Sequence, residues 1–133
     1  MILGLGTDLC DIERVADTLK RFPGRFENRC FTMQEQARAE RRPLKRYDRY
    51  AQMFAAKEAC SKALGTGFRQ GVFWRDMEVV HLRSGKPTMR LTGGALERMC
   101  ALTPDGMRAQ VEVSLTDESG LANAVVIIFA VPA

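Results

Sequence analysis

The chain has 133 residues, of which 46% are apolar and 27% are charged. This length fits one domain over residues 1–133, and the composition excludes a disordered or collagen-like chain. The net charge of +4 predicts attraction to anionic partners, without choosing among nucleic acid, acidic protein and phosphorylated small molecules.

Targeting signals and zinc-site spacings are also missing from the pattern. One histidine and four cysteines without a CxxC pair do not match the spacing of zinc ribbons. The first residues lack the basic region of a signal peptide, and the longest apolar run, residues 124–131, is too short to span a membrane. We therefore expect a reduced, cytoplasmic protein with no membrane segment.

The first elements in chain order are a strand and a helix. Residues 2–9 are apolar and predict a buried strand that ends near Asp8. Asp11 then has the position of an N-cap, and the helix that follows it is ended by Pro23 and Gly24.

Three more helices are predicted in the first half. A short one covers residues 26–31. Thr32 and Glu35 form a capping box that starts a polar helix ending near residue 42. Helical periodicity returns over residues 45–64, with a stripe of small residues every fourth position, and a Gly-Thr-Gly sequence ends it.

The second half changes to strands. Residues 77–83 and 88–91 read as two strands joined by a turn, and residues 94–102 as a short helix. Residues 107–116 alternate between apolar and polar side chains, and residues 121–131 predict a buried strand joined to them by a turn at 117–120. The sum is an α+β fold with a mostly antiparallel sheet.

The helical half carries the positive charge. Residues 13–49 hold eleven lysines and arginines against six acids, a net charge of +5, so the remainder is slightly acidic. This pattern is typical either of a solvated helical surface or of a surface that binds an acidic partner.

One segment of the predicted long helix contains the strongest candidates for functional residues. Phe54, Glu58 and Lys62 are spaced four apart and lie on one helix face. Glu58 and Lys62 alone are an ordinary surface pair, worth about 0.3–0.5 kcal/mol. Asp8 at the strand end is either a helix cap or a ligand of a metal or phosphate. Two carboxylates are enough to bind Mg²⁺ together with substrate phosphates, and a nearby lysine would hold a phosphate oxygen.

The two glycines before Asp8 support a close approach at that strand, because a missing side chain lets another backbone or a ligand come near. The combination of two acids and one lysine suits phosphoryl transfer. The P-loop pattern GxxxxGK[ST] is absent, so nucleotide binding of that class has no support.

These two segments resemble the signatures of a known family. Residues 4–14, beginning Gly-Leu-Gly-Thr-Asp, resemble the first signature of bacterial holo-[acyl-carrier-protein] synthases, the short type of 4′-phosphopantetheinyl transferase. Residues 54–67, beginning Phe-Ala-Ala-Lys-Glu-Ala, resemble the second, at about the interval that the family uses. The likeness continues through residues 74–79, 85–87 and the final hairpin, so it covers nearly the whole chain.

The resemblance implies an enzyme that moves 4′-phosphopantetheine from coenzyme A to a serine of apo-acyl carrier protein, for fatty acid biosynthesis. It implies the family's fold, an N-terminal strand and helices packed on a mostly antiparallel sheet. Asp8 and Glu58 match the family's Mg²⁺ ligands, and Lys62 matches the lysine at the transferred phosphate. We expect Glu58 and Lys62 to be catalytic. The base that takes the serine proton is left open, with Glu58, directly or through a metal-bound water, as the hypothesis.

Further residues match by position. The family likeness also implies a homotrimer whose clefts lie between subunits, so that each cleft combines Asp8 and Glu58 of one chain with late-strand residues of another. Residues expected to bind coenzyme A are Lys57, Lys62, Gly65, Gly85, Lys86 and Pro87. Residues that resemble the family's docking surface for the acidic carrier protein are Arg14, Arg21, Phe22, Arg25 and Phe26.

Two positions depart from the family pattern. Met53 stands where many relatives have a basic residue, and Asp117 stands where the family commonly has a histidine. An acid near the phosphates of coenzyme A should repel them, so a catalytically silent family member is one alternative. A basic module that binds RNA or DNA is another, although no RNP-like or helix-turn-helix pattern is present, and we expect no nucleic-acid partner.

Overall fold

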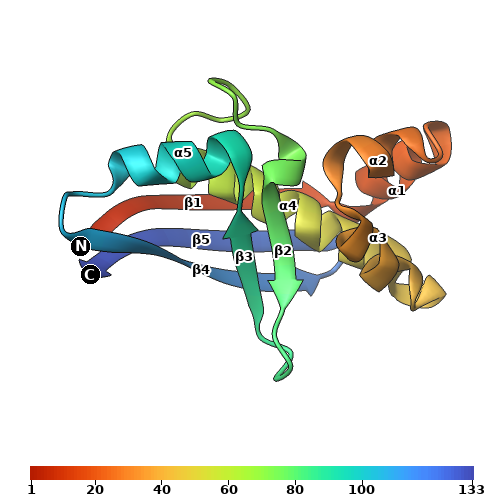
Figure 1. The fold of residues 1–133 in the computed structure, drawn as a ribbon. Coiled ribbons are helices and arrows are strands. Elements are labelled where there is room, and N and C mark those ends of the chain that lie inside the picture. Colours follow the sequence, from red (N-terminus) through yellow and green to blue (C-terminus); the bar gives the residue numbers. More distant parts are fainter.

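The computed structural model describes residues 1–133, and its centre is a three-stranded antiparallel sheet with one long helix across it (Figure 1). The strands lie in the order β1-β5-β4. Both ends of the chain lie at the same end of this sheet (Figure 1). The strands are β1 (Ile2–Asp11), β4 (Met107–Glu118) and β5 (Leu121–Pro132).

The long helix α4 (Arg46–Leu64) covers one face of the sheet. Its small residues at every fourth position, from Ala51 to Ala63, are all buried. Small side chains on β5 face them, because Ala122 and Ala124 are fully buried as well. Small residues on both sides let the helix and the sheet pack closely.

The opposite face of the sheet has no covering element. Leu5 and Leu9 of β1 are both 62% exposed, and Leu5 pairs across the strands with Ile127. Val125, Ile127 and Phe129 of the central strand stay only half-buried. An apolar face of this kind on a central strand needs a partner to leave water.

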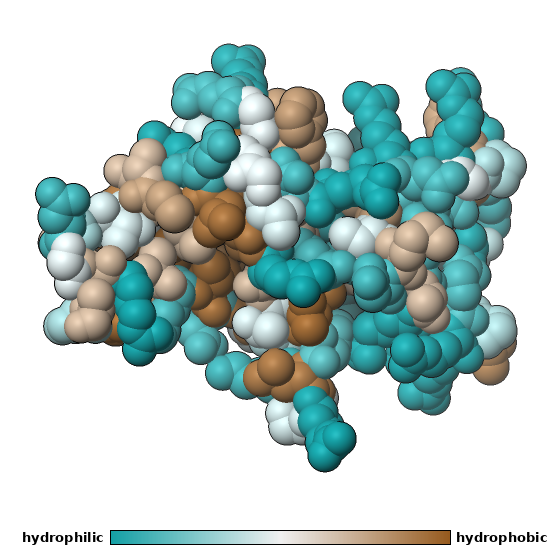
Figure 2. All heavy atoms as spheres, viewed as in Figure 1, coloured by the Kyte–Doolittle hydropathy of each residue, from teal (hydrophilic) through white to brown (hydrophobic).

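The helices of the first half gather at one end of the sheet (Figure 1). Hydrophilic side chains cover this end of the molecule (Figure 2), in agreement with the excess of basic residues there. Asp11 caps the first of these helices by accepting hydrogen bonds from the backbone N–H groups of Glu13 and Arg14. The helices are α1 (Ile12–Arg21), α2 (Arg25–Cys30), α3 (Met33–Glu40) and the 3₁₀ turn η1 (Pro43–Lys45).

A second, two-stranded sheet stands across the first (Figure 1). It consists of β2 (Met77–His81) and β3 (Pro87–Leu91), preceded by the 3₁₀ turn η2 (Trp74–Asp76) and followed by α5 (Gly93–Leu102). None of the helices in the structure combines the length and the apolar composition that crossing a bilayer requires.

The predicted α+β fold is confirmed, with differences at element ends and in one burial prediction. The first strand was expected to be buried, but as an edge strand it leaves Ile2, Leu5 and Leu9 exposed. The first strand continues past residue 9 to Asp11, because Ala122 and Leu121 of β5 still pair with Cys10 and Asp11. The last hairpin turns at Ser119 and Gly120 alone, with φ of 53° and 79°, which is the geometry of a tight two-residue turn. The predicted four-residue turn at 117–120 was therefore too long.

Candidate functional site

Asp8 reaches the site because β1 lies unusually close to α4. A side chain on Gly6 would overlap the carbonyl oxygen of Ala59, and one on Gly4 would overlap that of Ala63. The glycines therefore serve the approach of another backbone, one of the two possibilities that their position suggested. The carbonyl of Asp8 also accepts a hydrogen bond of 3.0 Å from the side-chain amide of Asn123, which fixes the strand at this point.

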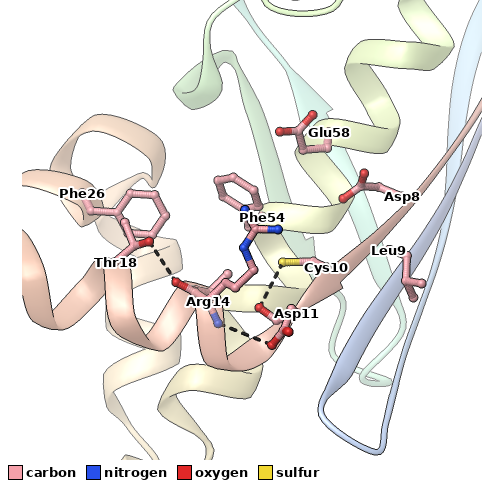
Figure 3. Close-up of a pocket in the computed structure, with 10 residues that line it drawn as sticks. Asp8, Leu9, Cys10, Asp11, Arg14, Thr18, Phe26, Phe54 and Glu58 are labelled. Carbon is pink, nitrogen blue, oxygen red and sulfur yellow. Dashed lines mark hydrogen bonds between the residues drawn. The ribbon is translucent and has the colours of Figure 1, made fainter.

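Asp8 and Glu58 line one pocket of about 360 Å³ between β1, α1 and α4. Their carboxylates point into the same open space, while Leu9 points to the other face of the sheet (Figure 3). Phe54 and Phe26 form the apolar wall of this pocket. The structure thus brings together the two acids that lie 50 positions apart in the sequence.

Lys62 completes this group. Its Nζ lies 3.3 Å from Oδ1 of Asp8 and donates a hydrogen bond of 3.0 Å to the carbonyl of Thr7. The lysine side chain is still 54% exposed, so it remains accessible from solvent while it contacts Asp8. A phosphate oxygen that approaches Asp8 would find this lysine beside it.

The charges around Glu58 have opposing effects on its proton. Burial raises the pKa of the Glu58 carboxyl, and the negative charge of Asp8 raises it further, whereas Lys62 lowers it. Two carboxylates that destabilise each other in this way attract a cation. Oxygen donors from two acids are the ligand set that Mg²⁺ takes when substrate phosphates and water complete its shell, so these residues fit that ion.

A second pocket of about 370 Å³ continues from the first along α1 and α2. Thr18 and Phe26 line both pockets. Arg14 lines the first, whereas Phe22 and Arg25 line the second. The predicted docking residues therefore border one groove that leads to Asp8 and Glu58.

The fifth predicted docking residue, Arg21, lines neither pocket, but it contacts a residue that does. Its guanidinium lies over the ring of Phe22, 5.3 Å from the centroid. No pattern in the sequence singled out Thr18 or Asn123 as residues of the site. The position of Thr18 one turn after Arg14 on the same helix face is the only signal that could have indicated it.

Lys57 is placed differently from the expectation. Its side chain is fully buried, and Nζ lies 2.9 Å from Oε1 of Glu35, which is fully buried as well. It also donates to the carbonyls of Trp74 and Met77 at 2.9 and 2.8 Å. Because its ammonium has three partners inside the core, the expected contact with coenzyme A through this side chain has no room.

The remaining residues expected to bind coenzyme A lie outside the pocket. Gly65 ends α4 with φ of 79°, a left-handed conformation that favours glycine. Gly85 and Lys86 lie in the exposed turn of the β2–β3 hairpin, and Pro87 is the first residue of β3. Nζ of Lys86 lies 3.1 Å from Glu112. Within one chain, the hairpin turn and the two acids do not meet.

The two positions that depart from the family pattern also have clear places. Met53 is 2% exposed and belongs to the core. Asp117 is exposed on β4 and accepts a hydrogen bond from the side-chain amide of Gln52. Neither residue lines the pocket of Asp8 and Glu58.

Known proteins with similar sequences and structures bear on this site. The chain is 60% identical over 132 residues to the holo-[acyl-carrier-protein] synthase of Methylobacterium nodulans, which covers 99% of each protein. The crystal structure of the Neisseria meningitidis synthase is similar with a TM-score of 0.83 and 32% identity, over 97% of this chain and 99% of that one. The Helicobacter pylori synthase in complex with coenzyme A gives a TM-score of 0.79 and 26% identity, over 94% and 99%.

The family model described as the 4′-phosphopantetheinyl transferase superfamily matches residues 4–116. This range contains both signature segments and every residue of the pocket. With this match over most of its length and relatives of such high identity, the chain belongs to the 4′-phosphopantetheinyl transferase superfamily.

Proposed function

We propose that this protein is a holo-[acyl-carrier-protein] synthase, which transfers 4′-phosphopantetheine from coenzyme A to a serine of apo-acyl carrier protein. The observation that carries the proposal is the meeting of Asp8, Glu58 and Lys62 at the end of a basic and apolar groove. The similarity to synthases over the full chain supports it.

The proposed reaction is a displacement at the β-phosphorus of coenzyme A. The serine oxygen forms a new bond to that phosphorus, and the bond from phosphorus to the bridging oxygen breaks. Adenosine 3′,5′-bisphosphate leaves with the bridging oxygen, and the serine proton goes to Glu58. Lys62 beside Asp8 stabilises the negative charge on the phosphate oxygens and the leaving group.

Asp8 and Glu58 are the residues that would hold a magnesium ion. When bound, that ion would neutralise charge on the pyrophosphate of coenzyme A. Both acids lie on regular secondary structure, one on a strand tied to its neighbour by Asn123 and one on a buried helix. Their orientation is therefore set before a substrate arrives, and little ordering is left for the reaction step.

We propose that the rest of the coenzyme site comes from a neighbouring chain in a homotrimer. The uncovered apolar face that includes Leu5, Leu9, Ile127 and Phe129 supports an assembly, because it would otherwise stay in water. In that arrangement Gly85, Lys86 and Pro87 of one chain would complete the pocket of the next, next to its Gly65. Lys57 has no contact role in this site.

Acyl carrier protein is the partner that suits the groove. Arg14, Arg21 and Arg25 are exposed along one side of it, and Phe22 and Phe26 supply apolar contacts. Carrier proteins are acidic, so the arginines would speed the encounter while the aromatic pair supplies specificity. The groove leads the serine of the partner toward Glu58.

The direct test is transfer of labelled pantetheine from coenzyme A to apo-acyl carrier protein, with and without magnesium. We expect Asp8→Asn and Glu58→Gln to slow turnover by roughly 10²–10⁴-fold, the scale of lost electrostatic stabilisation, with unchanged circular dichroism. Asp105→Asn, an exposed acid that lines neither this pocket nor the groove, is the matched control. Wild-type rates in both site variants would refute the site, and coenzyme A binding without any transfer would identify a silent family member.

Mixing variants tests the shared cleft. Asp8→Asn and Lys86→Gln are each expected to have low transfer activity alone. A co-refolded mixture of the two should regain part of the activity, because some clefts then receive an intact Asp8 from one chain and an intact Lys86 from another. Sedimentation should give a trimer. No recovery in a mixture that sediments as a trimer would contradict a cleft built from two chains.

A further inference from the structure

A third pocket, of about 360 Å³, lies between α3 and β2, away from the groove and the two acids. Arg38 of α3 and Arg41, the residue directly after α3, line one side, and His81 of β2 and Arg90 of β3 line the other. Arg49 of α4 reaches the same place, because its Nη1 donates to the backbone carbonyl of Arg38 at the end of α3. Neither the reaction nor the docking surface uses these residues.

The acid in this pocket is already neutralised. Glu78 is buried, and its carboxylate lies 2.6 Å from Nη2 of Arg90 and accepts a hydrogen bond of 2.6 Å from the hydroxyl of Thr32. It is the only carboxylate among the residues that line the pocket. Its charge is therefore not available to balance further arginines.

Three arginines consequently remain without an acidic partner: Arg38, Arg41 and Arg49. None of them takes part in an ion pair, in contrast to Arg46, which binds Glu40 at 2.7 Å. They also oppose one another, since burial lowers the pKa of Arg38 and the charges of Arg49 and Arg41 lower it further.

The end of α3 explains only part of this arrangement. The negative end of a helix stabilises nearby cations, and Arg49 uses one of its five N–H groups on the Arg38 carbonyl. The other N–H donors of the three guanidinium groups have no hydrogen-bond partner in the protein. The imidazole of His81 has a buried Nδ1 without a hydrogen-bond partner, so this side chain, too, is not fully bonded.

We propose that this pocket, lined by Arg38, Arg41 and His81 and completed by Arg49, is a binding site for a phosphate group. Several guanidinium groups that converge on one pocket suit the oxygens of a phosphate, because each can offer two parallel N–H donors. A dianionic phosphate relieves the repulsion among three unpaired cations more than a monovalent anion does. The ligand is either free phosphate or the phosphomonoester of a nucleotide, and both present the same group.

Calorimetric titration with inorganic phosphate, at constant ionic strength balanced with chloride, tests the site directly. Arg38→Gln and Arg41→Gln should each weaken phosphate binding about tenfold or more, the scale of a lost charged hydrogen bond. Arg42→Gln is the matched control, because Arg42 is exposed one position beyond Arg41 and does not line the pocket. Circular dichroism checks that each variant is folded.

A second titration with adenosine 3′-phosphate, and with adenosine as its blank, separates the two sources. Tighter binding of the nucleotide than of phosphate, lost in Arg38→Gln, would assign the site to a nucleotide, and equal binding would assign it to free phosphate. The absence of saturable binding by the wild type, or equal affinities in Arg38→Gln and Arg42→Gln, would overturn the proposal. Neither titration depends on the transfer reaction.

Discussion

Removing the buried ammonium of Lys57 should destabilise the whole protein. We consider Lys57→Met, which keeps a long apolar side chain of similar size and deletes only the charge and its hydrogen bonds. In the wild type, the ammonium has three partners: Glu35 and the carbonyls of Trp74 and Met77. The pair is fully buried on both sides, so water cannot replace it.

The size of the effect follows from what remains. Glu35 keeps hydrogen bonds from the backbone N–H groups of Thr32 and Val79, but its charge loses its counter-charge. Breaking a buried ion pair from one side costs about 3–5 kcal/mol. For a chain of this length, that corresponds to a fall in Tm of roughly 10–20 °C. The double variant Glu35→Gln with Lys57→Met removes the unpaired charge and should recover part of this loss.

Urea unfolding followed by circular dichroism measures both variants. Lys45→Met is the matched control, because Lys45 pairs with Asp48 only at the surface, at 3.8 Å, and its loss should cost below about 1 kcal/mol. The coenzyme A affinity of the folded protein is the second reading. Unchanged stability in Lys57→Met together with a selective loss of coenzyme affinity would refute the structural role and restore the contact role expected from the sequence.

Three further outcomes are expected. Gly6→Ala should lower the free energy of unfolding by about 1–3 kcal/mol or more, because the new methyl group overlaps the backbone carbonyl of Ala59. Urea unfolding measures this change, and an unchanged urea midpoint would contradict the close packing. Arg25→Gln should lower kcat/KM for acyl carrier protein at low salt and reduce its salt dependence, with kcat unchanged at saturating partner; equal salt dependence in variant and wild type would exclude Arg25 from the docking surface. Burial and the charges of Arg38 and Arg49 lower the pKa of His81, so the unfolded chain binds more protons than the folded protein just below pH 6.5. The free energy of unfolding should therefore fall as the pH drops through that range. His81→Gln should show a smaller fall, and a pH profile identical to that of the wild type would contradict this.

The pocket of Asp8 and Glu58 was the part of the site that local patterns predicted well. The glycines before Asp8 indicated a close approach, and the four-residue spacing put Glu58 and Lys62 on one face. What the patterns did not contain was the distance between the strand and the helix. Only the packing of Gly4 and Gly6 against the α4 backbone decides that the two acids share a pocket.

The place of Lys57 could not be predicted from its neighbours in the sequence. Its neighbours in the sequence are Ala56 and Glu58, and nothing in that window indicates a partner 22 positions earlier. A charged residue beside a predicted site is usually taken to act in it, whereas this one links α4 to α3 and to the backbone that leads into β2. Long-range pairing inside a core leaves no periodic signal.

The arginines of the third pocket illustrate the same limit on the surface. Arg38, Arg41 and Arg49 belong to the basic stretch that was equally compatible with a solvated face. Their convergence depends on how α3 and α4 are placed beside β2, and on Arg90 taking the one acid nearby. The composition predicts the net positive charge of this stretch, but it does not predict which arginines lack an acidic partner in the folded protein.

The position of β1 at the edge of the sheet has a consequence for folding. Its only neighbouring strand is β5, so the first strand of the fold pairs with the strand that is farthest from it in the sequence. Asp8 is bonded to Asn123, 115 positions later, and contacts of that separation form late and slowly. The helices α1 to α4 can form early, but we expect Asp8 to reach its final position beside Glu58 only after β5 has paired with β1.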